Sequence, residues 1–205
     1  MAETRSGGVI LASGSWSRRQ LLEAAGVTFT AVPADVDERA IRETLQDGDN
    51  EIDPADVAEV LARAKAEHVS QAHPDAIVIG SDQILALGDE IFEKPPDMAG
   101  ARNHLTKLRG RTHQLHCGVV LAQGGATIWS HVDTASLTMR SFTPAFLDAY
   151  LDGAGPSICA SVGAYQLEGM GIQLFERIEG DYFTILGLPL LPLLGALRER
   201  EVLAS

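Results

Sequence analysis

Residues 112–139 read THQLHCGVVLAQGGATIWSHVDTASLTM, and this stretch decides the fold class. Its two halves, 112–122 and 127–139, are each predicted to form a long β-strand. The pair Gly124-Gly125 lies between them and is typical of a tight turn. Strands joined by so short a turn run antiparallel, so we expect a sheet that is not purely parallel.

Outward from this pair, helices and strands alternate along the chain. Further strands are expected at 9–13, 27–32, 76–87 and 90–93. Helices are expected at 17–25, from Asp53-Pro54 towards His73-Pro74, at 98–108, after Thr143-Pro144 and at 190–202, with a glycine-rich section at 153–187. The predicted fold is therefore α/β: a mixed, partly antiparallel sheet flanked by helices, in one domain over residues 1–205.

The charge balance limits the partners that this chain can bind. Its 205 residues carry 28 acidic and 16 basic side chains, a net charge of −12, which argues against nucleic-acid polymers and anionic membranes as partners. An anionic small molecule is compatible with this charge, because a pocket can be locally positive. The longest apolar run, 185–194, is about half a membrane span and is interrupted by glycine and proline. We expect a cytoplasmic protein with reduced cysteines, Cys117 and Cys159.

Several familiar catalytic signatures are absent. There is no G-x-x-x-x-G-K-[ST] phosphate loop and no G-x-S-x-G turn of a serine hydrolase. An acyl or glycosyl hydrolase is disfavoured, since the cluster at 35–38 is the one evident group of carboxylates. The histidines do not form H-E-x-x-H and are expected as surface or strand residues: His104, His113, His116 and His131.

The junction of the first strand and the first helix is a candidate phosphate site. Residues 12–19 read ASGSWSRR. A helix N-terminus presents unpaired N–H groups, Ser13 and Ser15 add hydroxyls, and Arg18 can clamp phosphate oxygens. The alternative is that one serine caps the helix while the arginines are solvated.

Asp82 is the residue hardest to explain without a function. It interrupts the apolar segment 76–87 within Gly80-Ser81-Asp82-Gln83. A carboxylate there costs several kcal/mol unless it is paired or binds a metal. The glycine and serine leave room for a ligand and Gln83 offers an amide, whereas the alternative is a structural aspartate at a bulge.

Two further groups have the chemistry of a metal–nucleotide site. The acids at 35–38, which include Glu38, suit a cation, and Lys65 and Lys94 suit phosphates, although each is also typical of a solvated face.

Residues 163–169 read GAYQLEG, in which Tyr165 can stack on a base and Glu168 can accept its hydrogen bonds. The alternative for this segment is a tight loop.

Together these segments resemble the Maf family of nucleotide pyrophosphatases. The motifs occur in order along essentially the whole chain: LASGS at 11–15, Asp37-Glu38, Lys65, GSDQ at 80–83, EKP at 93–95, residues 163–171 and GLPL at 187–190. The resemblance implies a Maf/ITPase-like fold with a deep nucleotide-binding cleft. It also implies hydrolysis of a nucleoside triphosphate between its α and β phosphates, a divalent cation (Mg²⁺ or Mn²⁺) and, in many members, a homodimer.

The resemblance also implies roles for individual residues. Asp82 is the expected proton acceptor and, with Glu38, the expected metal ligand. Arg18, Lys65 and Lys94 are expected to stabilise charge on the leaving pyrophosphate. The remaining expected substrate contacts are Ser13, Ser15, Gln83, Tyr165 and Glu168.

Two departures from the family pattern leave the preferred base open. Trp16-Ser17-Arg18 stands where Pro-Arg-Arg is common, so one arginine of the usual pair is replaced by Ser17. GSDQ replaces the Gly-Ala-Asp-Thr of the branch that prefers dTTP and UTP. With Glu168, it resembles the branch that acts on 7-methyl-GTP. The alternatives are therefore general removal of non-canonical nucleotides, a 7-methyl-GTP pyrophosphatase, and a regulator of cell division that binds nucleotides without hydrolysing them.

Overall fold

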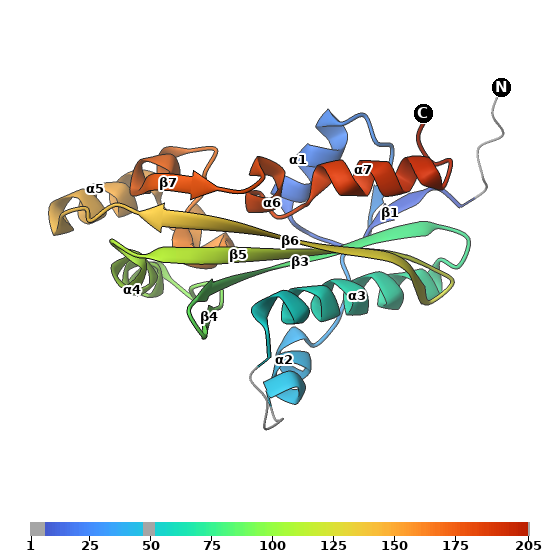
Figure 1. Ribbon diagram of the computed structural model, residues 1–205, viewed down its shortest axis with the longest axis horizontal. Helices are drawn as coiled ribbons and strands as arrows, with labels where there is room; N and C mark the ends of the chain where they lie inside the picture. The colour runs from blue at the N-terminus through green and yellow to red at the C-terminus, as the bar shows by residue number, and fades with distance from the viewer. Residues whose placement is uncertain (1–6, 47–51, 205) are drawn as a thin grey trace.

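The computed structural model describes residues 7–46 and 52–204, so residues 1–6, 47–51 and 205 of the predicted domain lie outside it. In the described part the strands form a seven-stranded sheet in the order β2-β1-β3-β5-β6-β7, and β4 pairs with β3 (Figure 1). The strands are β1 (Val9–Leu11), β2 (Thr30–Ala31), β3 (Ile77–Leu87), β4 (Glu90–Phe92), β5 (Thr112–Gln123), β6 (Ala126–Met139) and β7 (Phe175–Glu179).

The sheet is mixed, which confirms the predicted fold class. β1 runs parallel to β2 and β3, whereas the pairs from β3 through β5 and β6 to β7, and the pair of β3 with β4, are antiparallel. The predicted central hairpin is β5–β6, and its turn requires glycine because φ is 59° at Gly124 and 82° at Gly125.

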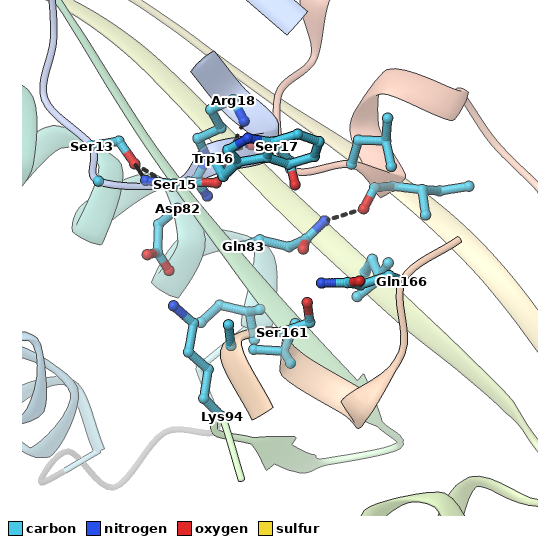
Figure 2. Close-up of a pocket in the computed structure, with 18 of the residues that line it drawn as sticks. Ser13, Ser15, Trp16, Ser17, Arg18, Asp82, Gln83, Lys94, Ser161 and Gln166 are labelled. Atoms are coloured by element: carbon cyan, nitrogen blue, oxygen red, sulfur yellow. Dashed lines mark hydrogen bonds between the residues drawn. The ribbon is translucent and has the colours of Figure 1, made fainter. Parts of the chain in front are cut away.

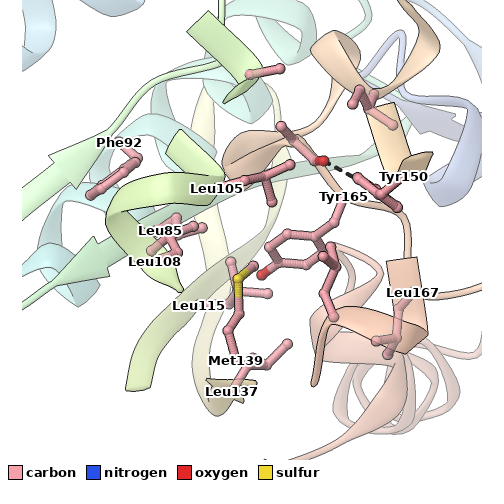
Figure 3. Packing of buried hydrophobic residues seen from close by; sticks show 14 of the residues in the cluster. Leu85, Phe92, Leu105, Leu108, Leu115, Leu137, Met139, Tyr150, Tyr165 and Leu167 are labelled. Carbon is pink, nitrogen blue, oxygen red and sulfur yellow. Dashed lines mark hydrogen bonds between the residues drawn. The ribbon is translucent and has the colours of Figure 1, made fainter. Parts of the chain in front are cut away.

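Helices cover both faces of the sheet. α3 (Pro54–Ala72) packs on one face, and α1 (Trp16–Ala24) and α7 (Leu190–Glu199) lie on the other (Figure 1). α4 (Met98–Leu108) and α5 (Pro144–Ala154) pack at one end, where Tyr165 joins a cluster of buried leucines (Figure 3). None of the helices in the described part of the chain combines the length and the hydrophobicity that a membrane span requires.

Some local predictions were wrong. The strand expected at 27–32 is reduced to Thr30–Ala31, because the Val27 N–H bonds to the Leu22 carbonyl and closes α1 instead. α2 (Glu38–Gln46) was not predicted from the sequence; its Ile41 packs against buried residues of α3 and against Ile84 of β3. The glycine-rich section contains three 3₁₀ turns (Pro156–Ala160, Val162–Ala164 and Met170–Leu174), β7 and α6 (Tyr182–Ile185).

Candidate functional site

A cavity of about 560 Å³ lies where β1 enters α1, beside the middle of β3. Segments far apart in the sequence form its walls: the β1–α1 junction, α2, α3, the segment after β4, residues 160–168 and residues 185–187. Every site residue expected from the sequence lines it: Ser13, Ser15, Arg18, Glu38, Lys65, Asp82, Gln83, Lys94, Tyr165 and Glu168. The fold therefore gathers the whole candidate set in one place.

The alternation of β3 separates its polar residues onto two faces of the sheet. Asp82 points towards α3, where its Oδ1 lies 2.6 Å from Lys65 Nζ. Ser81 and Gln83 point the other way: Ser81 Oγ donates to the Gly187 carbonyl at 3.0 Å, and Gln83 Nε2 donates to the carbonyls of Thr184 and Ile185. Asp82 thus faces a charged partner, while Ser81 and Gln83 hold the end of α6 and the residues that follow it.

Lys65 is the centre of a buried charge cluster. Its Nζ lies 2.6 Å from Asp82 Oδ1 and 2.8 Å from Glu38 Oε1. Lys65 is 8% exposed and Asp82 is 6% exposed, so the pair is largely removed from water. Asp82 Oδ2 is buried and has no hydrogen-bond partner among the described residues. One oxygen of Asp82 is therefore held in place while the other is left without a partner.

Glycine lets α3 come close enough for this contact. A Cβ on Gly80 would lie 2.2 Å from the Ala62 carbonyl oxygen, and one on Gly118 would lie 2.6 Å from the Ala58 carbonyl oxygen. Gly118 is the residue on β5 directly opposite Asp82. The two glycines allow the helix that carries Lys65 to pack closely on the strand that carries Asp82.

Arg42 joins the cluster and was not expected from the sequence. Its guanidinium bonds Glu38 Oε2 at 3.0 Å and Glu93 Oε1 at 2.9 Å, and it lines the cavity. Partial burial would by itself raise the pKa of Glu38, but Lys65, then Arg42 and Lys94, hold this pKa below its ordinary value. The i,i+4 spacing of Glu38 and Arg42 would have signalled this pair had α2 been predicted.

The β1–α1 junction is prearranged around Ser13. Ser15 caps α1 by accepting from the Arg18 N–H at 3.4 Å, and its own N–H donates to Ser13 Oγ at 3.2 Å. Arg18 is held by Ser13 Oγ at 3.1 Å and by the Gly187 carbonyl at 2.7 Å (Figure 2). The capping alternative is therefore true of Ser15, but Arg18 is not a solvated arginine: it lies in the cavity wall.

The last three expected residues differ in exposure. Lys94 and Glu168 are exposed, and both line the cavity. Tyr165 is only 5% exposed; its hydroxyl bonds His113 Nε2 at 2.8 Å, and its ring lies edge-on to Phe175 at 4.9 Å. Burial raises the pKa of Tyr165 and lowers that of His113 to about 4. Tyr165 therefore belongs largely to the core, with one edge in the cavity wall.

The carboxylates of the cavity suit a cation that takes its remaining ligands from water and from the phosphates of a substrate. The described residues contain no group of three or more His, Cys, Asp or Glu side chains that could cage a metal ion. Mg²⁺ usually binds one or two carboxylates and completes its shell with water and substrate phosphates. Asp82 Oδ2 fits that role, whereas both oxygens of Glu38 are already paired with Lys65 and Arg42.

Comparisons with known proteins identify the family. The chain is 58% identical over 190 residues to the 7-methyl-GTP pyrophosphatase of Mesorhizobium japonicum, which covers 93% of this chain and 94% of that protein. It is 52% identical to the nucleoside triphosphate pyrophosphatase of Paramagnetospirillum magneticum, over 93% of this chain and 97% of that protein. A solved HAM1 protein from Coxiella burnetii matches with a TM-score of 0.40 and 15% identity, over 65% of this chain and 73% of that one. The family model described as Maf-like protein matches residues 8–200, and the chain therefore belongs to the Maf family.

Proposed function

We propose that this chain is a nucleoside triphosphate pyrophosphatase, which cleaves the bond between the α and β phosphates and releases a nucleoside monophosphate and pyrophosphate. The observation that carries the proposal is the unpartnered, buried Oδ2 of Asp82, in one cavity with Lys65, Arg18 and the N-terminus of α1. The names of the two relatives support the same reaction.

We propose a task for each group on the basis of its position. The Asp82 carboxylate accepts a proton from the water that attacks the α-phosphorus, while Lys65 contacts Oδ1 and so fixes its orientation. As the bond to the bridging oxygen breaks, negative charge grows on the pyrophosphate. Arg18, Lys94 and the N–H groups at the start of α1 stabilise that charge, and Ser13 orients Arg18.

A divalent cation, Mg²⁺ or Mn²⁺, is part of the proposal. Asp82 Oδ2 would hold it, and Glu38 would join only by releasing Lys65 or Arg42. When bound, such a cation neutralises phosphate charge and makes a bound water more acidic. The lowered pKa of Glu38 keeps a second carboxylate ionised beside this position.

We further propose 7-methyl-GTP as the preferred substrate, with removal of other non-canonical triphosphates as the broader alternative. Several relatives at 52–58% identity carry the name 7-methyl-GTP pyrophosphatase. Glu168 lines the cavity and offers a carboxylate to the donor edge of a guanine base. The expected homodimer and cytoplasmic location stay predictions.

Pyrophosphate release by the purified protein tests the proposal directly. The substrates are 7-methyl-GTP, GTP, dTTP, UTP and other modified triphosphates, each with Mg²⁺, Mn²⁺ or excess EDTA. We expect release with either cation, loss of release in EDTA, and a fall in kcat of at least about 10² in Asp82→Asn. Asp89→Asn is the matched control, because Asp89 carries the same charge on the exposed turn between β3 and β4.

Two results would overturn the proposal. Near-wild-type turnover in Asp82→Asn would remove Asp82 from proton transfer. Binding of nucleotides without pyrophosphate release from any substrate would instead favour the non-catalytic regulator of cell division.

A further inference from the structure

Trp16 is an exposed aromatic side chain at the edge of the candidate site. It is 66% exposed, more than any other large hydrophobic residue in the described part of the chain, and it lines the cavity. It is the first residue of α1, directly after the capping Ser15. An indole left in water at this place has no explanation in packing, because the buried residue of α1 is Leu22.

The position of Trp16 suits contact with the part of a nucleotide beyond its phosphates. Figure 2 shows Trp16 on the same side of the cavity as Ser13, Ser15 and Arg18, with Gln166 and Ser161 on the opposite side. Both Gln166 and Ser161 line the cavity. A ligand with phosphates at the start of α1 therefore has an aromatic surface on one side and polar groups on the other.

Tyr165, the aromatic residue expected to stack on the base, does not offer a free ring face. His113 and Phe175 pack against its ring, with centroids 5.7 Å and 4.9 Å away. A Cβ on Gly163 would lie only 2.6 Å from the ring, so that residue also packs tightly against it. Trp16 is thus the aromatic side chain of the cavity wall whose surface is open to a ligand.

We propose that Trp16 is the stacking platform for the base and a determinant of preference for 7-methylguanine. This inference rests on the proposed function, because it assumes that phosphates lie at the start of α1. Methylation at N7 gives the base a positive charge, and the electron-rich face of tryptophan attracts a cation placed over it. The exposed carboxylate of Glu168, which also lines the cavity, adds to the attraction for a cationic base.

Tryptophan fluorescence tests contact without requiring turnover. The chain has two tryptophans, and Trp129 lies on β6, stacked on His131 and outside the set of cavity-lining residues. In a Trp129→Phe background, the α,β-methylene analogue of 7-methyl-GTP should quench Trp16 saturably. The GTP analogue should quench with weaker affinity, and inorganic triphosphate should quench little. Absence of saturable quenching by either nucleotide analogue would overturn the proposal.

Steady-state kinetics provide a second test of the role of Trp16. Stacking on one base is typically worth about 5- to 150-fold in affinity, so Trp16→Ala should raise KM for 7-methyl-GTP by a factor in that range. The effect on GTP should be at least about twofold smaller. Trp16→Phe should restore most of the affinity, whereas Trp16→Leu, which is apolar without a π face, should not. Equal KM values in all four proteins, or equal effects on both substrates, would refute the role.

Failure of this inference is distinguishable from failure of the proposed function. Normal hydrolysis of 7-methyl-GTP by Trp16→Ala would overturn the stacking role and leave the pyrophosphatase intact. Saturable quenching without pyrophosphate release in the wild-type protein would support the stacking role and overturn catalysis.

Discussion

Replacing Gly80 by alanine should push α3 away from the sheet and weaken both the fold and the site. The new Cβ would lie 2.2 Å from the Ala62 carbonyl oxygen and 2.7 Å from Ala66 Cβ. Both obstacles belong to the rigid part of a helix, so neither can turn aside. Restoring an ordinary contact of about 3.5 Å with the Ala62 oxygen requires α3 to move by roughly 1.3 Å.

The expected losses of stability and of turnover follow from the close packing of α3 on the sheet. Overpacking a core by a methyl group costs about 1–3 kcal/mol of unfolding free energy. The same movement adds up to roughly 1.3 Å to the 2.6 Å distance between Lys65 Nζ and Asp82 Oδ1, which makes it longer than a hydrogen bond. A misplacement of that size costs up to about 10²-fold in turnover, and we expect kcat to fall by about 10- to 100-fold.

Urea unfolding and pyrophosphate release measure the two effects separately. The matched control is Gly195→Ala in α7, where an added Cβ has no atom within 4 Å. Alanine there should stabilise the helix by about 0.5–1 kcal/mol and leave turnover unchanged. A wild-type urea midpoint in Gly80→Ala would refute the close-packing argument. A lowered midpoint with wild-type turnover would show that the approach of α3 does not position Lys65.

Three further predictions concern the charge cluster, the buried histidine and the helix cap. Lys65→Met should lower the unfolding free energy by about 3–5 kcal/mol, because it leaves the buried carboxylate of Asp82 without its charged partner. Adding Asp82→Asn should recover part of this loss. Strictly additive losses of the two variants in urea unfolding would contradict a direct interaction between the two residues. Burial lowers the pKa of His113 to about 4, against 6.5 for an unburied histidine. As the pH falls, His113 is therefore protonated in the unfolded chain before it is protonated in the folded protein. The wild-type protein should therefore lose about 2 kcal/mol more than His113→Gln between pH 7.5 and pH 5, and equal losses would refute this linkage. Ser15→Ala should cost about 1 kcal/mol and raise KM, while an unchanged urea midpoint would show that the cap contributes nothing.

Sequence reasoning succeeded best where a single residue contradicted its surroundings. Asp82 stood out because a carboxylate in an apolar strand needs a partner, and the structure supplies that partner in Lys65. The serines and Arg18 stood out because a strand-to-helix junction exposes N–H groups. The roles of these residues in binding and catalysis stay predictions.

Other features escaped because they depend on neighbours distant in the chain. Arg42 was missed together with α2, and its link to Glu93 spans 51 residues. Tyr165 was expected to face a base, but its ring is buried and its hydroxyl meets His113 on β5. In the sequence Trp16 stands out only as a departure from a family pattern, because its exposure depends on the folded structure.

Local residue patterns were enough to predict the hairpin over 112–139, the mixed sheet and the polar break in β3, because these features follow from local turns and from the two-residue period of a strand. Local patterns do not reveal that Asp82 meets Lys65, or that its Oδ2 has no partner among the described residues. That outcome depends on how closely α3 approaches β3 and β5 at Gly80 and Gly118. Local periodicity sets the face on which a side chain lies, whereas the distance between two elements arises from packing among residues far apart in the chain.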